Sequence, residues 1–255
     1  AHPSQPDGLS AKGLRSQLDA SLKAVGVAGF AEFYLHQPDT EHALLDSLRE
    51  MDAMIKESLI GAIGLSNFHH DEAKRAFELC EEHCLTKPTV YQGLYNPLNR
   101  WTEAELIPML RAHGCSFVAY NPLAAGLLSG SHSAGVDVPM GRFKENPNYL
   151  PRFYTDPNFA ALESLRAACD LEGWSLLKAT YTWLCRHSVL GPDDGVLLGA
   201  SSSTQLDQNL GACLEARTTE LPPALRSAFD AVWDEGADLR AAAFPYWRSY
   251  SADMP

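Results

Sequence analysis

The sequence predicts an α/β fold in which parallel strands and helices alternate around part of a barrel. Helical segments and short apolar runs alternate about five times along the 255 residues, at spacings typical of barrel repeats. Polar or aromatic residues stand at the end of each apolar run, the edge where α/β barrels hold their functional groups. One polar strand end is ordinary for a loop, but five in succession favour a functional edge.

Two helices are predicted from apolar residues that recur every three or four positions. The first series is Leu14, Leu18, Leu22 and Val25, and the second is Leu44, Leu45, Leu48, Met51 and Ile55. Capping boxes predict two more helix starts, at Thr102 with Glu105 and at Ser202 with Gln205. Because proline belongs in a first turn, Pro108 indicates that the helix after Thr102 begins later than its box alone predicts.

The apolar runs are too short for helices, and their nearly continuous hydrophobicity is typical of parallel strands covered on both faces. They are Phe33–Leu35, Ala62–Leu65, Thr89–Gln92, Phe117–Tyr120 and Gly195–Leu198. Glycines and prolines interrupt the alternation in residues 121–158, which predicts a long functional loop. No linker or repeat divides the chain, so we expect one domain over residues 1–255.

Composition argues against several functions. The formal net charge is −12 and the basic residues are scattered, so neither nucleic acid nor an anionic membrane surface is an expected partner. No apolar run approaches the roughly 18 residues that span a bilayer. The six irregularly spaced cysteines predict free thiols and a cytoplasmic protein. Cys80 and Cys84 share a predicted helix face, but no second ligand pair stands nearby, so no metal site is expected.

Five blocks, taken in order, resemble the aldo-keto reductase family and are closest to its aflatoxin-aldehyde and succinic-semialdehyde reductase branch. They are FYLHQPD (33–39), IGLSNF (63–68), YQGLYN (91–96), AYNPLAAGLLSG (119–130) and the segment 198–210. The resemblance covers nearly the whole chain. It implies a TIM-type (β/α)8 barrel whose first strands are missing, so that the chain corresponds to the C-terminal three quarters of the domain.

In this family a tyrosine protonates the substrate carbonyl while a hydride arrives from nicotinamide, and a histidine orients the carbonyl. The resemblance places that histidine at His36, although a packed histidine at a strand end is the alternative. The family's Asp, Tyr and Lys precede the helix that here holds Leu14, and nothing in the chain matches them. Tyr34 lies inside a strand and is not an expected substitute. We therefore expect an upstream extension of roughly three strand–helix units and an inactive isolated chain.

The resemblance also implies a nicotinamide-cofactor site at the strand ends. Ser66, Asn67 and Gln92 match residues that bind the carboxamide, and Tyr120 matches the aromatic residue that stacks on the ring. The loop around the pyrophosphate is matched by Asn121, Pro122, Leu123, Ala124, Ala125, Gly126, Leu127, Leu128, Ser129 and Gly130. The segment that opens the last helix against the adenosine phosphate is matched by Gly199, Ser201, Ser202, Gln205 and Asn209.

The resemblance implies NADP as the cofactor. NAD is not excluded, because Ser131 and Gln205 stand where relatives often have a cation, and fewer cations weaken the binding of a 2′-phosphate. Arg142, Arg152 and Arg248 are candidate contacts for an anionic group of the substrate or cofactor, although a lone arginine is more often a solvated surface group. The leading hypothesis is NADPH-dependent reduction of aldehydes and ketones by the parent enzyme. The alternatives are a non-catalytic nicotinamide-nucleotide-binding module that senses redox state or binds a partner, and an unrelated phosphate-binding barrel. A small carbonyl compound is the expected substrate, and the chain is a possible homodimer.

Overall fold

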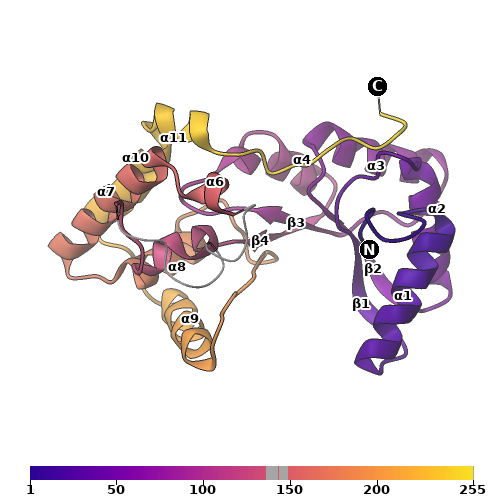
Figure 1. Ribbon diagram of the computed structural model, residues 1–255, viewed down its shortest axis with the longest axis horizontal. Coiled ribbons are helices and arrows are strands. Elements are labelled where there is room, and N and C mark those ends of the chain that lie inside the picture. The colour runs from indigo at the N-terminus through magenta and orange to yellow at the C-terminus, as the bar shows by residue number, and fades with distance from the viewer. Residues whose placement is uncertain (136–142, 144–148, 255) are drawn as a thin grey trace. The chain divides into compact units, whose positions relative to one another are not determined.

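The structure, a computed structural model, describes residues 1–135, 143 and 149–254 (Figure 1). Two compact units divide the chain, and each draws on separate stretches of sequence. The first unit comprises Ala1–Gly93, Thr102–Val118 and Pro245–Pro255, and the second comprises Leu94–Trp101 and Ala119–Phe244.

The first unit contains strands and the helices that follow them. Its helices are α1 (Ala11–Val25), α2 (Leu44–Lys56), α3 (His70–Glu82) and α4 (Leu106–Ala112). Its strands are β1 (Phe30–Leu35), β2 (Ile60–Ser66), most of β3 (Val90–Leu94) and the start of β4 (Ser116–Tyr120). Ser10 caps α1 by accepting a hydrogen bond from the Gly13 backbone N–H, and Gly26 ends that helix at a φ of 77°.

The second unit is mainly helical. It contains η2 (Ala124–Ser129), α6 (Leu150–Phe153), α7 (Asp156–Glu172), α8 (Leu176–Arg186), β5 (Gly195–Val196), α9 (Ser203–Ala216), α10 (Pro223–Asp234) and α11 (Ala237–Ala242). A short 3-10 helix, η1 (Trp101–Glu103), spans the boundary in sequence between the two units.

The predicted α/β class is confirmed. The strands pair in the order β1-β2-β3-β4-β5, and the described residues form an open five-stranded sheet instead of a closed barrel. The pairs β1–β2 and β2–β3 are parallel, with Leu35 opposite Leu65 and Ser66 opposite Gln92. Each predicted strand is present, with ends that differ by up to three residues from those predicted.

Two sequence expectations need correction. The Thr102 capping box does not start a helix: a 3-10 turn comes first, and α4 begins at Leu106 with Pro108 in its first turn, as the proline indicated. The expected long loop over residues 121–158 is interrupted by η2, α6 and the start of α7. The central part of that loop lies outside the described residues.

The C-terminal segment 245–254 packs within the first unit. Its backbone and side chains make hydrogen bonds with residues that follow β1 and β2 and with the first turns of α2 and α3. These bonds join Arg248 to Asn67, Ser251 to Glu72, Ala252 to Asp39 and Asp253 to Leu44. Figure 1 shows this segment in yellow beside α3.

Glu72 is the most deeply buried carboxylate of this contact. Its Oε1 accepts a 2.6 Å hydrogen bond from the Ser251 backbone N–H, whereas Oε2 has no hydrogen-bond partner in the described part of the chain. Burial raises the pKa of Glu72 to about 7, against the opposing effect of the Ser251 hydrogen bonds. The folded chain therefore penalises the ionised form of this carboxyl.

Replacing Glu72 by Gln tests that penalty. The folded pKa lies above the ordinary value, so the cost is absent below about pH 4.5 and grows as the pH rises toward 7. We expect Glu72→Gln to be more stable than the parent at pH 8 by on the order of 2–3 kcal/mol, and this difference to shrink toward pH 5. Urea unfolding at both pH values measures it.

The matched control is Glu78→Gln, which changes a partly exposed carboxylate of the same helix that lies near Lys74 and Arg75, and it should lack the gain in stability at pH 8. A Glu72→Gln variant that is less stable than the parent at pH 8 would show that the ionised carboxylate stabilises the fold.

Candidate functional site

The first unit brings together four of the predicted site residues at the carboxyl ends of its strands. His36 directly follows β1, and its backbone N–H donates to the Ala1 carbonyl at 2.8 Å. The ring of His36 is exposed and lies 4.9 Å from the ring of His2. Partial desolvation, together with the positive charges of His2, the N-terminal amine and Arg248, lowers the pKa of His36. A neutral imidazole at this edge can hydrogen-bond a carbonyl oxygen.

Asn67 joins the ends of β1 and β2. Its Nδ2 donates to the His36 carbonyl at 2.7 Å and to the Ser66 Oγ at 3.0 Å. The residue is buried and has a φ of 60°, a left-handed conformation that asparagine tolerates better than most residues. The amide therefore fixes the backbone from which the His36 side chain projects.

Gln92 and Arg248 complete the first unit's part of the predicted set. The strand register places Gln92 opposite Ser66, and the Arg248 backbone N–H donates to the Asn67 carbonyl at 3.1 Å. Ser66 is buried, whereas Gln92 is half-buried. The structure thus gathers these residues around Asn67, although they are up to 212 positions apart in the sequence, from His36 to Arg248.

The second unit holds the other part of the predicted set, beginning at the end of β4. Tyr120 is half-exposed, and its carbonyl accepts a 3.3 Å hydrogen bond from the Tyr95 N–H. The Asn121 carbonyl accepts from Asn96 Nδ2 at 3.0 Å. Asn96 is fully buried and was not predicted as a site residue, although its position in the YQGLYN block could have indicated it. It supports the loop that follows Tyr120.

The loop from Asn121 to Gly130 has an unusual backbone. Left-handed φ values occur at Asn121, Ala124, Ala125, Gly126 and Gly130. Strain of this kind is of the order of 1–3 kcal/mol per non-glycine residue, and it clusters at ligand-binding segments. Within the same loop, the fully buried side chains of Leu127 and Leu128 anchor it to the second unit. Predicted contacts at Pro122, Leu123 and Ser129 belong to this segment.

The start of α9 confirms the predicted capping box. Ser202 Oγ accepts from the Gln205 N–H at 3.2 Å, and Gln205 Oε1 accepts from the Ser201 N–H and hydroxyl at 2.9 and 2.8 Å. Asn209 Nδ2 donates to the Gly199 carbonyl at 2.9 Å. These side chains organise the helix start, so an anion there would be attracted by the backbone N–H groups and the helix dipole.

The three candidate arginines fall into different places. Arg152 is in α6, where its guanidinium lies 5.2 Å from the ring centroid of Phe244, a cation–π contact. Arg248 belongs to the first unit, and Arg142 lies outside the described residues. Arg152 and Arg248 stay predicted contacts for an anionic group.

Two tyrosines of the first unit, Tyr34 and Tyr91, already make hydrogen bonds within the fold. Tyr34 donates a 2.5 Å hydrogen bond to Glu32 on the same strand, and burial followed by that hydrogen bond raises its pKa. Tyr91 is fully buried, and its hydroxyl donates to the Phe68 carbonyl at 2.6 Å. Neither arrangement is that of a proton donor facing a substrate.

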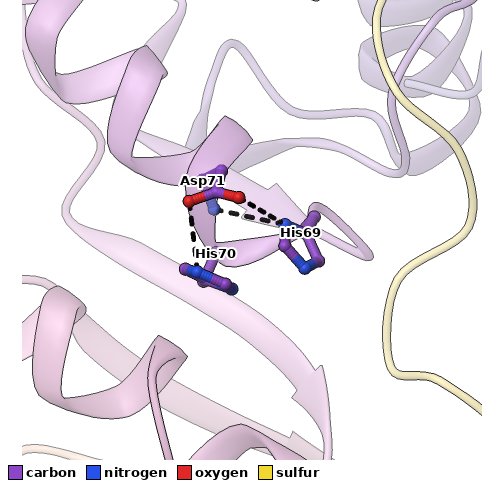
Figure 2. A group of neighbouring side chains, drawn as sticks. All are labelled: His69, His70 and Asp71. Atoms are coloured by element: carbon purple, nitrogen blue, oxygen red, sulfur yellow. Dashed lines mark hydrogen bonds and ion pairs between the residues drawn. The ribbon is translucent and has the colours of Figure 1, made fainter.

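Figure 2 shows a cluster with metal-ligand residue types, formed by His69, His70 and Asp71 at the start of α3. The Asp71 carboxylate lies 3.3 Å from His69 Nδ1 and 3.1 Å from His70 Nε2. His69 Nδ1 also accepts from the Asp71 backbone N–H at 3.4 Å and so caps the helix. Because a helix N-terminus repels cations, this capping arrangement accounts for the cluster without a metal ion.

The comparison with known proteins identifies the class to which this fold and these strand ends belong. The model of the aldo/keto reductase family matches residues 1–225, and the chain belongs to this family. The chain is 37% identical over 246 residues to aflatoxin B1 aldehyde reductase member 2 of Mus musculus. This alignment covers 92% of this chain and 66% of the mouse protein.

Human relatives give a similar result. Aflatoxin B1 aldehyde reductase member 2 of Homo sapiens is 37% identical over 245 residues, covering 91% of this chain and 67% of that protein. Aldo-keto reductase family 7 member A3 of Homo sapiens is 36% identical over 239 residues, covering 89% of this chain and 71% of that protein. The chain thus spans about two thirds of the length of these relatives. Among the described residues, none of the helices has the length and apolar character needed to span a bilayer.

Replacing Asn67 tests its part in holding the strand ends together. Asn67→Ala removes two hydrogen bonds and places alanine in a left-handed conformation that asparagine tolerates better, so we expect a loss of about 2–3 kcal/mol of stability. Asn67→Gly loses the same bonds but tolerates the backbone, and should recover roughly 1 kcal/mol of that loss. Urea unfolding followed by circular dichroism compares the variants. An Asn67→Ala variant as stable as the parent would show that Asn67 does not hold the strand ends together.

Proposed function

We propose that this chain provides the cofactor-binding and carbonyl-orienting part of an NADPH-dependent reductase of aldehydes and ketones. The observation that supports it most is the position of three matched residues around Asn67 in the first unit, His36, Ser66 and Gln92, with the candidate anion contact Arg248 beside them. Family membership and similarity to proteins named aldehyde reductases support the reaction class. The substrate class is a small carbonyl compound.

Each matched residue has a role that its environment allows. His36, with a lowered pKa, orients the substrate carbonyl through a neutral ring. Ser66, Asn67 and Gln92 offer hydroxyl and amide groups to the nicotinamide carboxamide, and Tyr120 offers a half-exposed aromatic face to the ring. NADPH, when bound, supplies the hydride. Arg152 and Arg248 are proposed anion contacts.

The residues present also fit the phosphates of a dinucleotide. The Asn121–Gly130 loop has left-handed positions that turn the backbone sharply, which is typical of segments that wrap phosphates. The exposed start of α9 offers backbone N–H groups to an anion. Gln205 is neutral and already serves the helix cap, so it adds no cation for a 2′-phosphate. We therefore propose NADP from the family resemblance, with NAD as the alternative.

A second candidate is a non-catalytic module that binds the same nucleotide and serves a partner or redox-sensing role. The engagement of Tyr34 and Tyr91 inside the fold favours it, because neither is placed as a proton donor. We also propose a cytoplasmic location, in line with free cysteines at every cysteine position. A homodimer stays a prediction.

We expect the purified chain to show no carbonyl reductase turnover above a heat-inactivated control. A positioned general acid contributes about 10²–10⁴-fold to such reactions, and no residue of this chain matches the family's acid. NADPH oxidation with 4-nitrobenzaldehyde and succinic semialdehyde measures the turnover. Measurable turnover would assign a proton donor within this chain, and Tyr34→Phe and Tyr91→Phe would then identify it.

Replacing Tyr120 by Ala tests the cofactor site without requiring turnover. The substitution removes the stacking face, so we expect a loss of about 1–3 kcal/mol in NADP binding and little change for adenosine 2′,5′-bisphosphate, which lacks nicotinamide. Gln205→Ala should weaken both ligands, because it disturbs the start of α9. Calorimetric titration of the two ligands separates the two ends. Equal losses for both ligands in Tyr120→Ala would refute the proposed orientation of the cofactor.

A further inference from the structure

Two cysteines from neighbouring helices lie in contact in the second unit. Cys185 is in the last turn of α8 and Cys213 is near the end of α9, and their sulfur atoms are 3.9 Å apart. Both side chains are partly exposed, so a small reagent can reach them. The helices α8 and α9 pack against each other, and a 2.9 Å ion pair between Lys178 of α8 and Glu215 of α9 also joins them.

The two thiols have different electrostatic surroundings. The sulfur atoms of Cys185 and Cys213 share a hydrogen bond in which either can be the donor. This hydrogen bond, with the positive charge of Arg217, lowers the pKa of Cys213 against the effect of burial. The same hydrogen bond and burial raise the pKa of Cys185. Cys213 is therefore the better nucleophile, and Cys185 is placed to react with it.

We propose that Cys213 and Cys185 form a peroxide-reactive dithiol that closes to a disulfide between α9 and α8. The Cys213 thiolate attacks one oxygen of a hydroperoxide, the O–O bond breaks, and the released hydroxide or alkoxide takes up a proton. The resulting sulfenic acid is attacked by the sulfur of Cys185. An S–S bond forms, water leaves with the proton of Cys185, and the two thiols together have reduced the peroxide by two electrons.

The distance and the helix positions make this closure feasible. The sulfur atoms must approach by about 1.9 Å to reach the usual S–S bond length of about 2.05 Å. Cys185 is one residue from the end of α8 and Cys213 is three residues from the end of α9, where helices adjust most easily. The other cysteines differ: Cys80, Cys115 and Cys169 are buried, and Cys84 is exposed and lies in the first unit.

Peptide mapping after mild oxidation tests the proposal, because trypsin separates the two cysteines. Cleavage after Lys178, Arg186 and Arg217 places them on the peptides Ala179–Arg186 and His187–Arg217. The reduced chain is treated with hydrogen peroxide, blocked with N-ethylmaleimide, digested without reductant and measured by mass spectrometry. We expect these two peptides to be joined, to separate on reduction, and to be joined equally in a Cys84→Ser control.

Single substitutions test which thiol reacts first. In Cys185→Ser the sulfenic acid at Cys213 has no partner, so dimedone should label Cys213. In Cys213→Ser dimedone should label Cys185 at least about tenfold more slowly. Circular dichroism checks that both variants keep the parent's fold. No joined peptide pair, a link between two chains, or preferential labelling of Cys185 would overturn the proposal.

Discussion

The hydrogen bonds of the Asn67 side chain are the contact on which the first unit's candidate site depends. One amide group holds the backbone of His36 and the hydroxyl of Ser66, while the Asn67 carbonyl receives the C-terminal segment at Arg248. A buried amide can do this because its two N–H groups and its backbone point in different directions. The left-handed φ is the conformational cost of that geometry.

In the second unit, the conformation of the backbone, instead of one side chain, holds the candidate site residues in place. Its β4 loop turns through several left-handed positions and is anchored by buried leucines. The start of α9 is held by Gln205, whose backbone N–H donates to Ser202 and whose side chain accepts from Ser201. Side chains that we propose as cofactor contacts therefore also build the fold. We expect substitutions at Gln205 or Asn67 to change stability and the proposed cofactor binding together, so ligand comparisons within one variant are more informative than comparisons between variants.

Strand and helix positions could be predicted because they depend on local patterns. The apolar run at Ala62–Leu65 and the capping box at Ser202 are visible in a few consecutive residues. Contacts between distant residues could not be predicted in this way. The pairing of Glu72 with Ser251 spans 179 positions, and that of Cys185 with Cys213 spans 28. The Thr102 box was wrong as a helix start, because Thr102 lies inside a 3-10 turn and its Oγ1 has no hydrogen-bond partner in the described part of the chain.

The return of residues 245–254 to the first unit affects how the protein is made. Domains usually fold as the ribosome extends them, at about 5–20 residues per second. The partners of Ser251 and Asp253, Glu72 and Leu44, are synthesised some 200 residues earlier, before all of the second unit. The first turns of α2 and α3 therefore lack these contacts until the ribosome has added residues 245–254, which is the period in which a chaperone would be most useful.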